Sequence, residues 1–209
     1  MYYQNSIIVT FVSVIFIILF SSMMAFIMSR RDFKFRKPLF IMIVIGMTIP
    51  FQVGIIPLYM QMSHMGLINK HVGIIIVYVV SYMSFSTFLM YGFFRTVPAE
   101  IQEAALIDGV SNLRMYWNII MPLSPAVVTA VAIFNLMYVW NDMFFSLVMI
   151  QSNPLKTLMI GLLGFRGQYM SDYATMFAGV VLVSLPMIVL FFLLQKRFVE
   201  GIAAGAIKG

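Results

Sequence analysis

Cysteine is absent from the 209 residues, which excludes disulfides and thiolate metal sites. Charge is also scarce, because 10% of the residues are charged and 62% are hydrophobic, whereas soluble domains carry roughly 25% charged residues. A water-soluble core of this length cannot hide so much apolar surface. A bilayer accepts apolar side chains on every face of a helix, so the composition predicts an all-α polytopic membrane protein.

Several functional motifs are missing as well. No Gly-x-x-x-x-Gly-Lys-Ser/Thr phosphate loop occurs, so the chain carries no P-loop site for ATP hydrolysis. The apolar runs hold no paired His or Asp set of the kind an intramembrane enzyme needs. His64 and His71 lie seven positions apart in a connection between runs, which is not a persuasive metal pair. We therefore expect no catalytic site, no metal and no cofactor in this chain.

Five apolar stretches are long enough to cross a ~30 Å hydrocarbon core at ~1.5 Å per residue. Pro50, Gly54 and Pro57 lie in the second, which predicts a kinked or locally unwound helix. The fourth is too long for one straight span, and we expect a break near Asn141 and Asp142. The predicted spans are residues 5–29, 39–62, 72–94, 121–150 and 174–195.

The net charge of +6 comes from lysines and arginines that cluster between these stretches. Ten of the thirteen lie after the first, third and fifth spans, and the other three are Lys70, Lys156 and Arg166. Excess basic residues mark the cytoplasmic side of a membrane protein. This distribution predicts an N-terminus outside the cell, a cytoplasmic tail at residues 196–209, and no role for the charge in nucleic-acid binding. The basic run at residues 30–37 fixes this topology, and it could also bind anionic lipid.

The gap at residues 95–120, between the third and fourth spans, is the most informative segment. Its first part is rich in helix-forming residues, Gly109 permits a left-handed stop, and Ser111 can cap a second short helix. We expect two short helices joined by a turn along the cytoplasmic face. Ala104 and Ala105 offer a smooth surface that another protein could approach closely. On these grounds alone, a helix that merely lies in the membrane interface is equally consistent.

A longer motif runs through this gap, and its residues are Glu103, Ala104, Ala105, Asp108, Gly109 and Pro122. The spacing resembles the EAA loop of ABC importer permeases. Met121 stands where that family usually has leucine, a volume-conserving difference. The resemblance implies a type I ABC importer transmembrane domain whose loop forms a coupling helix. It also implies that Ala104 and Ala105 face a cleft on the ATPase subunit.

Two further stretches narrow the resemblance. Residues 134–145 and 195–209 are similar to carbohydrate-importer permeases related to the smaller maltose-type membrane subunit. That similarity implies a second homologous permease, two copies of a cytoplasmic ATPase, an extracytoplasmic solute-binding protein and a carbohydrate substrate. Permeases of this group usually have six spans, so the first span is expected to be missing here, through a misplaced start or a truncation.

Polar residues within the spans are candidates for the translocation path. Asn135, Tyr138 and Asp142 lie at i, i+3 and i+7, so we expect them on one helix face. Such a face points to the bundle interior or to a water-filled path. Asp142 falls near the membrane edge, where a simply hydrated carboxylate is the favoured interpretation, and Asn135 could instead bond a neighbouring helix. Gln52 marks either an unwound segment lining a cavity or a packing kink.

Two other transport classes remain as alternatives. A secondary transporter driven by an ion gradient normally has acidic residues buried at mid-membrane, and Asp142 alone comes near that description. An ABC permease for a solute other than a sugar is the second alternative, since specificity depends largely on partner subunits.

Overall fold

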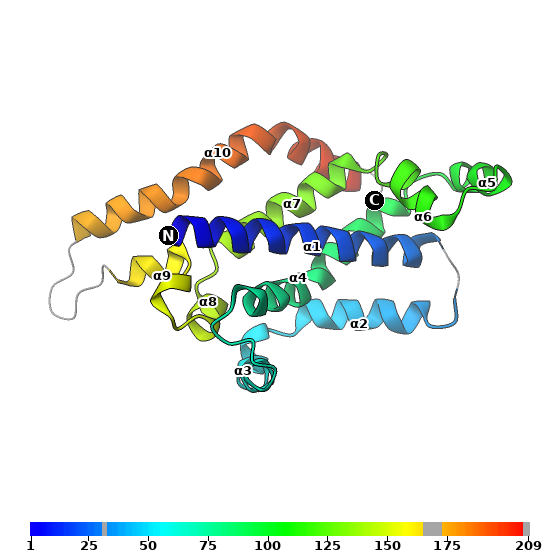
Figure 1. Ribbon diagram of the computed structural model, residues 1–209. Coiled ribbons are helices and arrows are strands. Elements are labelled where there is room, and N and C mark those ends of the chain that lie inside the picture. Colours follow the sequence, from blue (N-terminus) through cyan, green and yellow to red (C-terminus); the bar gives the residue numbers. More distant parts are fainter. Residues whose placement is uncertain (31–32, 165–172, 207–209) are drawn as a thin grey trace. The chain divides into compact units, whose positions relative to one another are not determined.

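The computed structural model describes residues 1–30, 33–164 and 173–206, and every regular element within these ranges is a helix. The elements are α1 (Tyr2–Arg30), α2 (Arg36–Thr48), η1 (Phe51–Gly54), α3 (Ile55–His64), α4 (His71–Phe94), α5 (Ala99–Ile107), α6 (Asn112–Met115), η2 (Tyr116–Ile120), α7 (Pro125–Trp140), α8 (Phe144–Met149), η3 (Asn153–Leu155), α9 (Leu158–Leu163) and α10 (Tyr173–Ala206) (Figure 1). The all-α prediction is confirmed.

Three of the described helices, α1, α4 and α10, are each long and apolar enough to cross a membrane. Two further spans arise if each of two bent helix pairs crosses as one. α10 extends past the predicted fifth span to Ala206, into the segment predicted as a tail. Residues 207–209 of that tail lie outside the described residues, as does Arg166 of the predicted topology count.

The second predicted span departs from a straight α-helix at the predicted place, with a sharp bend and a short 3-10 segment. α2 ends at Thr48, and the chain bends by 91° before the helical segment that begins at Phe51. Ile49 has an extended backbone with ψ 120°, as expected for a residue before proline, because the Pro50 ring disfavours helical geometry there. Pro50 also brings no N–H to continue the hydrogen-bond ladder.

The fourth predicted span is divided as well. α7 ends at Trp140 and α8 begins at Phe144, so the predicted break at Asn141 and Asp142 is confirmed. The helix α7 within this stretch begins at Pro125. The chain bends by 86° between the helical segment that ends at Ile120 and α7, since prolines occupy positions 122 and 125.

The chain divides into two compact units. Unit 1 comprises residues 1–16, 50–81 and 134–194, and unit 2 comprises residues 17–49, 82–133 and 195–209. Unit 2 has a large apolar core, to which Phe26, Met90, Phe94, Met115 and Tyr116 contribute. A smaller cluster in unit 1 is formed by Trp140, Leu158 and Val183. Ala105, Met115 and Tyr116 of the 95–122 segment belong to the unit 2 core.

Candidate functional site

The loop of residues 95–122 lies in unit 2 and turns sharply after α5. Gly109 follows α5 with φ 72°, so the predicted left-handed turn is confirmed. The Gly109 N–H donates to Leu106 O at 3.1 Å. The Val110 N–H donates to Ala105 O at 2.9 Å. Together these bonds form a Schellman motif, which satisfies carbonyl groups that the end of a helix leaves without partners.

The second helix of the loop begins at its predicted cap. Ser111 has an extended backbone, and its Oγ accepts a hydrogen bond from the Arg114 N–H at 3.4 Å. α6 then continues into η2, whose wider π-helical turn carries Tyr116. The two short helices predicted for this loop are therefore present.

Tyr116 anchors the loop to α1. Its hydroxyl lies 2.7 Å from Ser22 Oγ on α1, and its ring centroid lies 5.6 Å from that of Phe26. The side chain is only 2% exposed. Burying an aromatic ring while its hydroxyl is paired is strongly favourable. The loop is thus part of the unit 2 core and not a helix resting loosely on the surface.

Arg30 links the same loop to two span ends within unit 2. Its guanidinium donates to Phe94 O at the end of α4, at 2.6 Å. The Gln102 side-chain amide on α5 in turn donates to Arg30 O at 3.3 Å. A cation near a helix C-terminus is stabilised by the carbonyl groups that end the helix. Arg30 was assigned from the sequence to a basic run that fixes topology and could bind anionic lipid, and its contact with the end of α4 was not predicted.

The two alanines of the motif have different environments. Ala104 is exposed, whereas Ala105 is 5% exposed and packs in the apolar cluster with Phe94 and Tyr116. The expectation that both alanines face a partner is therefore wrong for Ala105. Neighbouring residues on a helix point about 100° apart, so Ala105 can contact the core while Ala104 remains exposed.

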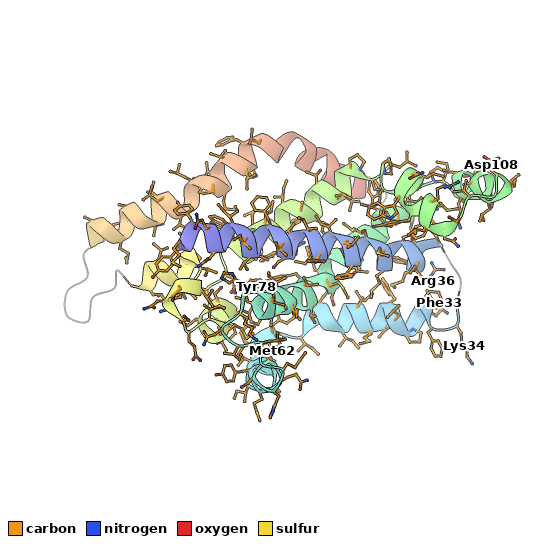
Figure 2. All side chains as sticks on the ribbon, viewed as in Figure 1. Phe33, Lys34, Arg36, Met62, Tyr78 and Asp108 are labelled. Carbon is orange, nitrogen blue, oxygen red and sulfur yellow. The ribbon has the colours of Figure 1, made fainter. Side chains whose placement is uncertain are left out.

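The remaining motif residues lie on the outer surface of the loop. Glu103, Asp108, Gly109 and Pro122 are all exposed, and Asp108 lies at the end of α5 (Figure 2). Two apolar side chains are exposed beside them, Leu106 at 51% and Ile107 at 85%. Apolar exposure on a helix outside the long spans is typical of a surface that binds a partner.

The candidate path residues lie in unit 1, where Asp142 follows α7. Asp142 Oδ2 accepts hydrogen bonds from the Tyr78 hydroxyl at 2.7 Å and from the Ser146 N–H at 3.1 Å. The Phe145 N–H donates to Asp142 Oδ1 at 3.4 Å. The carboxylate thus occupies the N-terminal end of α8, where a negative charge is stabilised.

Tyr78 completes this arrangement. It is fully buried, its hydroxyl also lies 2.9 Å from Ser146 Oγ, and its ring meets Phe145 edge-on at 6.1 Å. The simply hydrated carboxylate expected at Asp142 is therefore wrong, because three protein groups bond it. Tyr78 was missed from the sequence, since its partner lies 64 positions away in the chain.

Asn135 and Tyr138 do not share one environment. Asn135 is 1% exposed and Tyr138 is 52% exposed, although both lie on α7. The expected single polar face is thus divided between a buried amide and an exposed ring. Gln52 is exposed in η1, the short turn after the break at Pro50, so its segment departs from α-helix as predicted.

A set of side-chain bonds in unit 1 was not predicted at all. Asn69 has φ 57°, and its Oδ1 accepts hydrogen bonds from the Gln151 N–H at 2.6 Å and the Ser152 N–H at 2.9 Å. The Asn5 amide donates to Pro154 O and Lys156 O, both at 2.9 Å. These bonds join the start of α1 and the turn before α4 to the connection after α8.

This helical architecture is shared with proteins of known family. A family model described as a binding-protein-dependent transport system inner membrane component matches residues 6–203. One solved structure, a bacterial ABC transporter involved in the import of the acidic polysaccharide alginate, has a chain of the same fold. The TM-score is 0.82 with 22% identity, over 94% of this chain and 74% of that chain.

Proteins of similar sequence align with almost the whole chain. A putative ABC transporter permease, ORF2 of Caldicellulosiruptor sp. (strain Rt8B.4), is 37% identical over 100% of this chain and 76% of its own length. The melibiose/raffinose/stachyose import permease MelC of Bacillus subtilis (strain 168) is 34% identical over 98% of this chain and 75% of its own. With the family match, the helical architecture and the EAA-type loop, this chain belongs to the family of binding-protein-dependent transport system inner membrane components.

Proposed function

We propose that this chain is a permease subunit of an ABC importer, that it forms part of a path for carbohydrate uptake, and that the 95–122 loop couples it to a separate ATPase. The family match and the import of melibiose, raffinose and stachyose named for a relative support this reading. The remaining partners are a second homologous permease, a second ATPase copy and an extracytoplasmic solute-binding protein. The loop and the tail lie in the cytoplasm, because most basic residues flank that side.

The observation that carries the proposal is the two-sided construction of the loop. Ala105 and Tyr116 fix one side in the core of unit 2. Ala104, Leu106 and Ile107 are exposed on the other side. A coupling element must be stiff enough to transmit a displacement and must present a surface to the subunit that drives it. Closure of the ATPase pair then shifts the permease between two packed arrangements.

Ala104 provides the most direct test. Ala104→Phe places a ring on the exposed side, where it should prevent close approach of the ATPase. The helix itself should be little affected, since helix propensity changes by roughly 0.5 kcal/mol. We expect normal membrane levels, loss of the ATPase on co-purification, and loss of labelled oligosaccharide uptake in a deletion strain that the wild-type chain rescues.

Ala174→Phe is the matched control, because it enlarges another exposed alanine outside the loop. It should leave uptake and co-purification unchanged. Normal uptake by Ala104→Phe would show that the loop is a simple connector. Rescue of uptake for a solute other than a sugar, with no oligosaccharide transported, would replace the carbohydrate assignment while keeping the coupling mechanism.

A further inference from the structure

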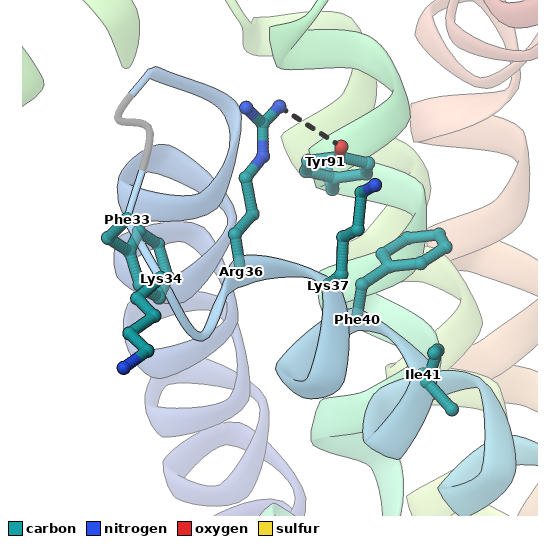
Figure 3. A pocket seen from close by; sticks show the side chains of 7 residues that line it. All are labelled: Phe33, Lys34, Arg36, Lys37, Phe40, Ile41 and Tyr91. Carbon is teal, nitrogen blue, oxygen red and sulfur yellow. Dashed lines mark hydrogen bonds between the residues drawn. The ribbon is translucent and has the colours of Figure 1, made fainter.

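An open pocket lies in unit 2, at the beginning of α2. The cavity has a volume of about 740 Å³ and opens to the outside. The residues that line it are Phe33, Lys34, Arg36, Lys37, Phe40, Ile41 and Tyr91 (Figure 3). Three of these seven side chains are cationic and none is acidic. The sequence alone could not distinguish a basic run that sets topology from one that builds a site.

Aromatic contacts organise the cationic groups of this cavity. The Arg36 guanidinium donates to the Tyr91 hydroxyl at 3.4 Å. Figure 3 shows Lys37 extending toward the same ring, while Lys34 points away from it at the rim. The Tyr91 ring is itself held by Phe40, with centroids 5.1 Å apart. Arg36 and Lys37 thus bring two cations next to the Tyr91 ring.

The cavity continues into an apolar surface. Ile41, Met42 and Ile45 follow it along α2 and are 57%, 71% and 52% exposed. α2 is also part of one of the bent pairs that could cross the membrane. A ligand bound here would therefore place its anionic group at the cations and could lay an apolar chain along the helix.

We propose that this cavity binds the phosphodiester headgroup of an anionic glycerophospholipid, with the acyl chains along the exposed side of α2. Guanidinium and ammonium groups recognise phosphate oxygens, and basic residues beside a membrane span attract anionic lipid. A soluble phosphate ester would use the cations equally well, but it would leave the apolar continuation of the site unused. The ligand is a lipid and not the transported solute, so lipid binding at this cavity does not depend on the proposed transport function.

Native mass spectrometry of the purified full chain with phosphatidylglycerol and phosphatidylcholine in equal amounts provides the test. The wild-type chain should retain phosphatidylglycerol preferentially. Arg36→Gln/Lys37→Gln should lower phosphatidylglycerol binding by about 30-fold, because each cation near the lipid surface contributes a comparable share. Lys70→Gln/Arg114→Gln removes two cations outside the cavity and should retain wild-type binding.

Two further measurements keep the result unambiguous. Lys37 is exposed, so Lys37→Gln should fold normally and still lower phosphatidylglycerol binding by about fivefold. Glycerol 3-phosphate at the lipid concentration should not displace phosphatidylglycerol. Equal retention of phosphatidylcholine, unchanged binding by both cavity variants, or displacement by glycerol 3-phosphate would each overturn the assignment of an anionic lipid.

Discussion

The 95–122 loop and the turn of residues 141–146 both interrupt the helical pattern, but different interactions stabilise them. The loop combines a local backbone motif at Gly109 with apolar burial of Ala105 and Tyr116. The turn relies on one carboxylate, Asp142, and on a buried tyrosine that bonds it. The loop is thus held mainly by packing of its buried side, with a few hydrogen bonds added at Gly109 and Tyr116. A polar turn depends on every hydrogen bond being made.

Among the variants that test this comparison, Tyr116→Ala should lose the most stability. Tyr116→Ala removes a buried ring and leaves a cavity in the unit 2 core, which should destabilise the chain by about 3–5 kcal/mol. Trp117→Ala is the matched control, because the neighbouring indole is 48% exposed. Thermal unfolding in detergent should separate the two variants clearly. Equal losses for both would mean that the loop is not anchored by burial.

Removal of the carboxylate at the turn should have an intermediate effect. Asp142→Ala removes the acceptor of the Phe145 and Ser146 N–H groups and one of two partners of the buried Tyr78 hydroxyl, at a cost of about 1–3 kcal/mol. Asp142→Asn keeps one acceptor oxygen and should lose less. Asn141→Ala changes the exposed neighbour and should be close to wild type in the same unfolding measurement. Wild-type stability of Asp142→Ala would show that the turn does not need its polar partners.

The left-handed turn should give the smallest change in stability. Gly109→Val requires a β-branched residue at φ 72°, which costs about 1–2 kcal/mol. No heavy atom beyond the adjacent residues lies within 4 Å of a Cβ placed there, so the cost comes from the local backbone and not from packed neighbours. Gly109→Asn should be tolerated, since asparagine adopts this conformation more readily. We expect reduced uptake at normal membrane levels for valine only, and equal uptake by both variants would contradict the role of the turn.

Local features of the loop were predictable because short-range chemistry decides them. A glycine after a run of helix formers predicts a left-handed stop, and a serine before a second run predicts a cap. Both predictions hold at Gly109 and Ser111. The break at Asn141 and Asp142 also follows from local length, since one straight span cannot use 30 residues of helix.

Which side chains are buried was less predictable than where the helices begin and end. Ala104 and Ala105 are identical in chemistry and adjacent in sequence, so their different environments depend on what lies against each side of α5. The same holds on α7, where Asn135 is buried and Tyr138 is exposed. Helical spacing predicts which residues share a face, but the neighbours of that face come from elsewhere in the chain.

The sequence by itself determined that this is a helical membrane protein, where its apolar runs lie, and where the chain turns at Pro50 and Gly109. These properties depend on composition and on backbone preferences that act within a few residues. Only the tertiary structure decided that Tyr116 pairs with Ser22, that Tyr78 reaches Asp142, and that Arg36 lies beside Tyr91 in a cavity. Such contacts join residues 55 to 94 positions apart. They exist because packed helices bring distant side chains together, which no local preference specifies.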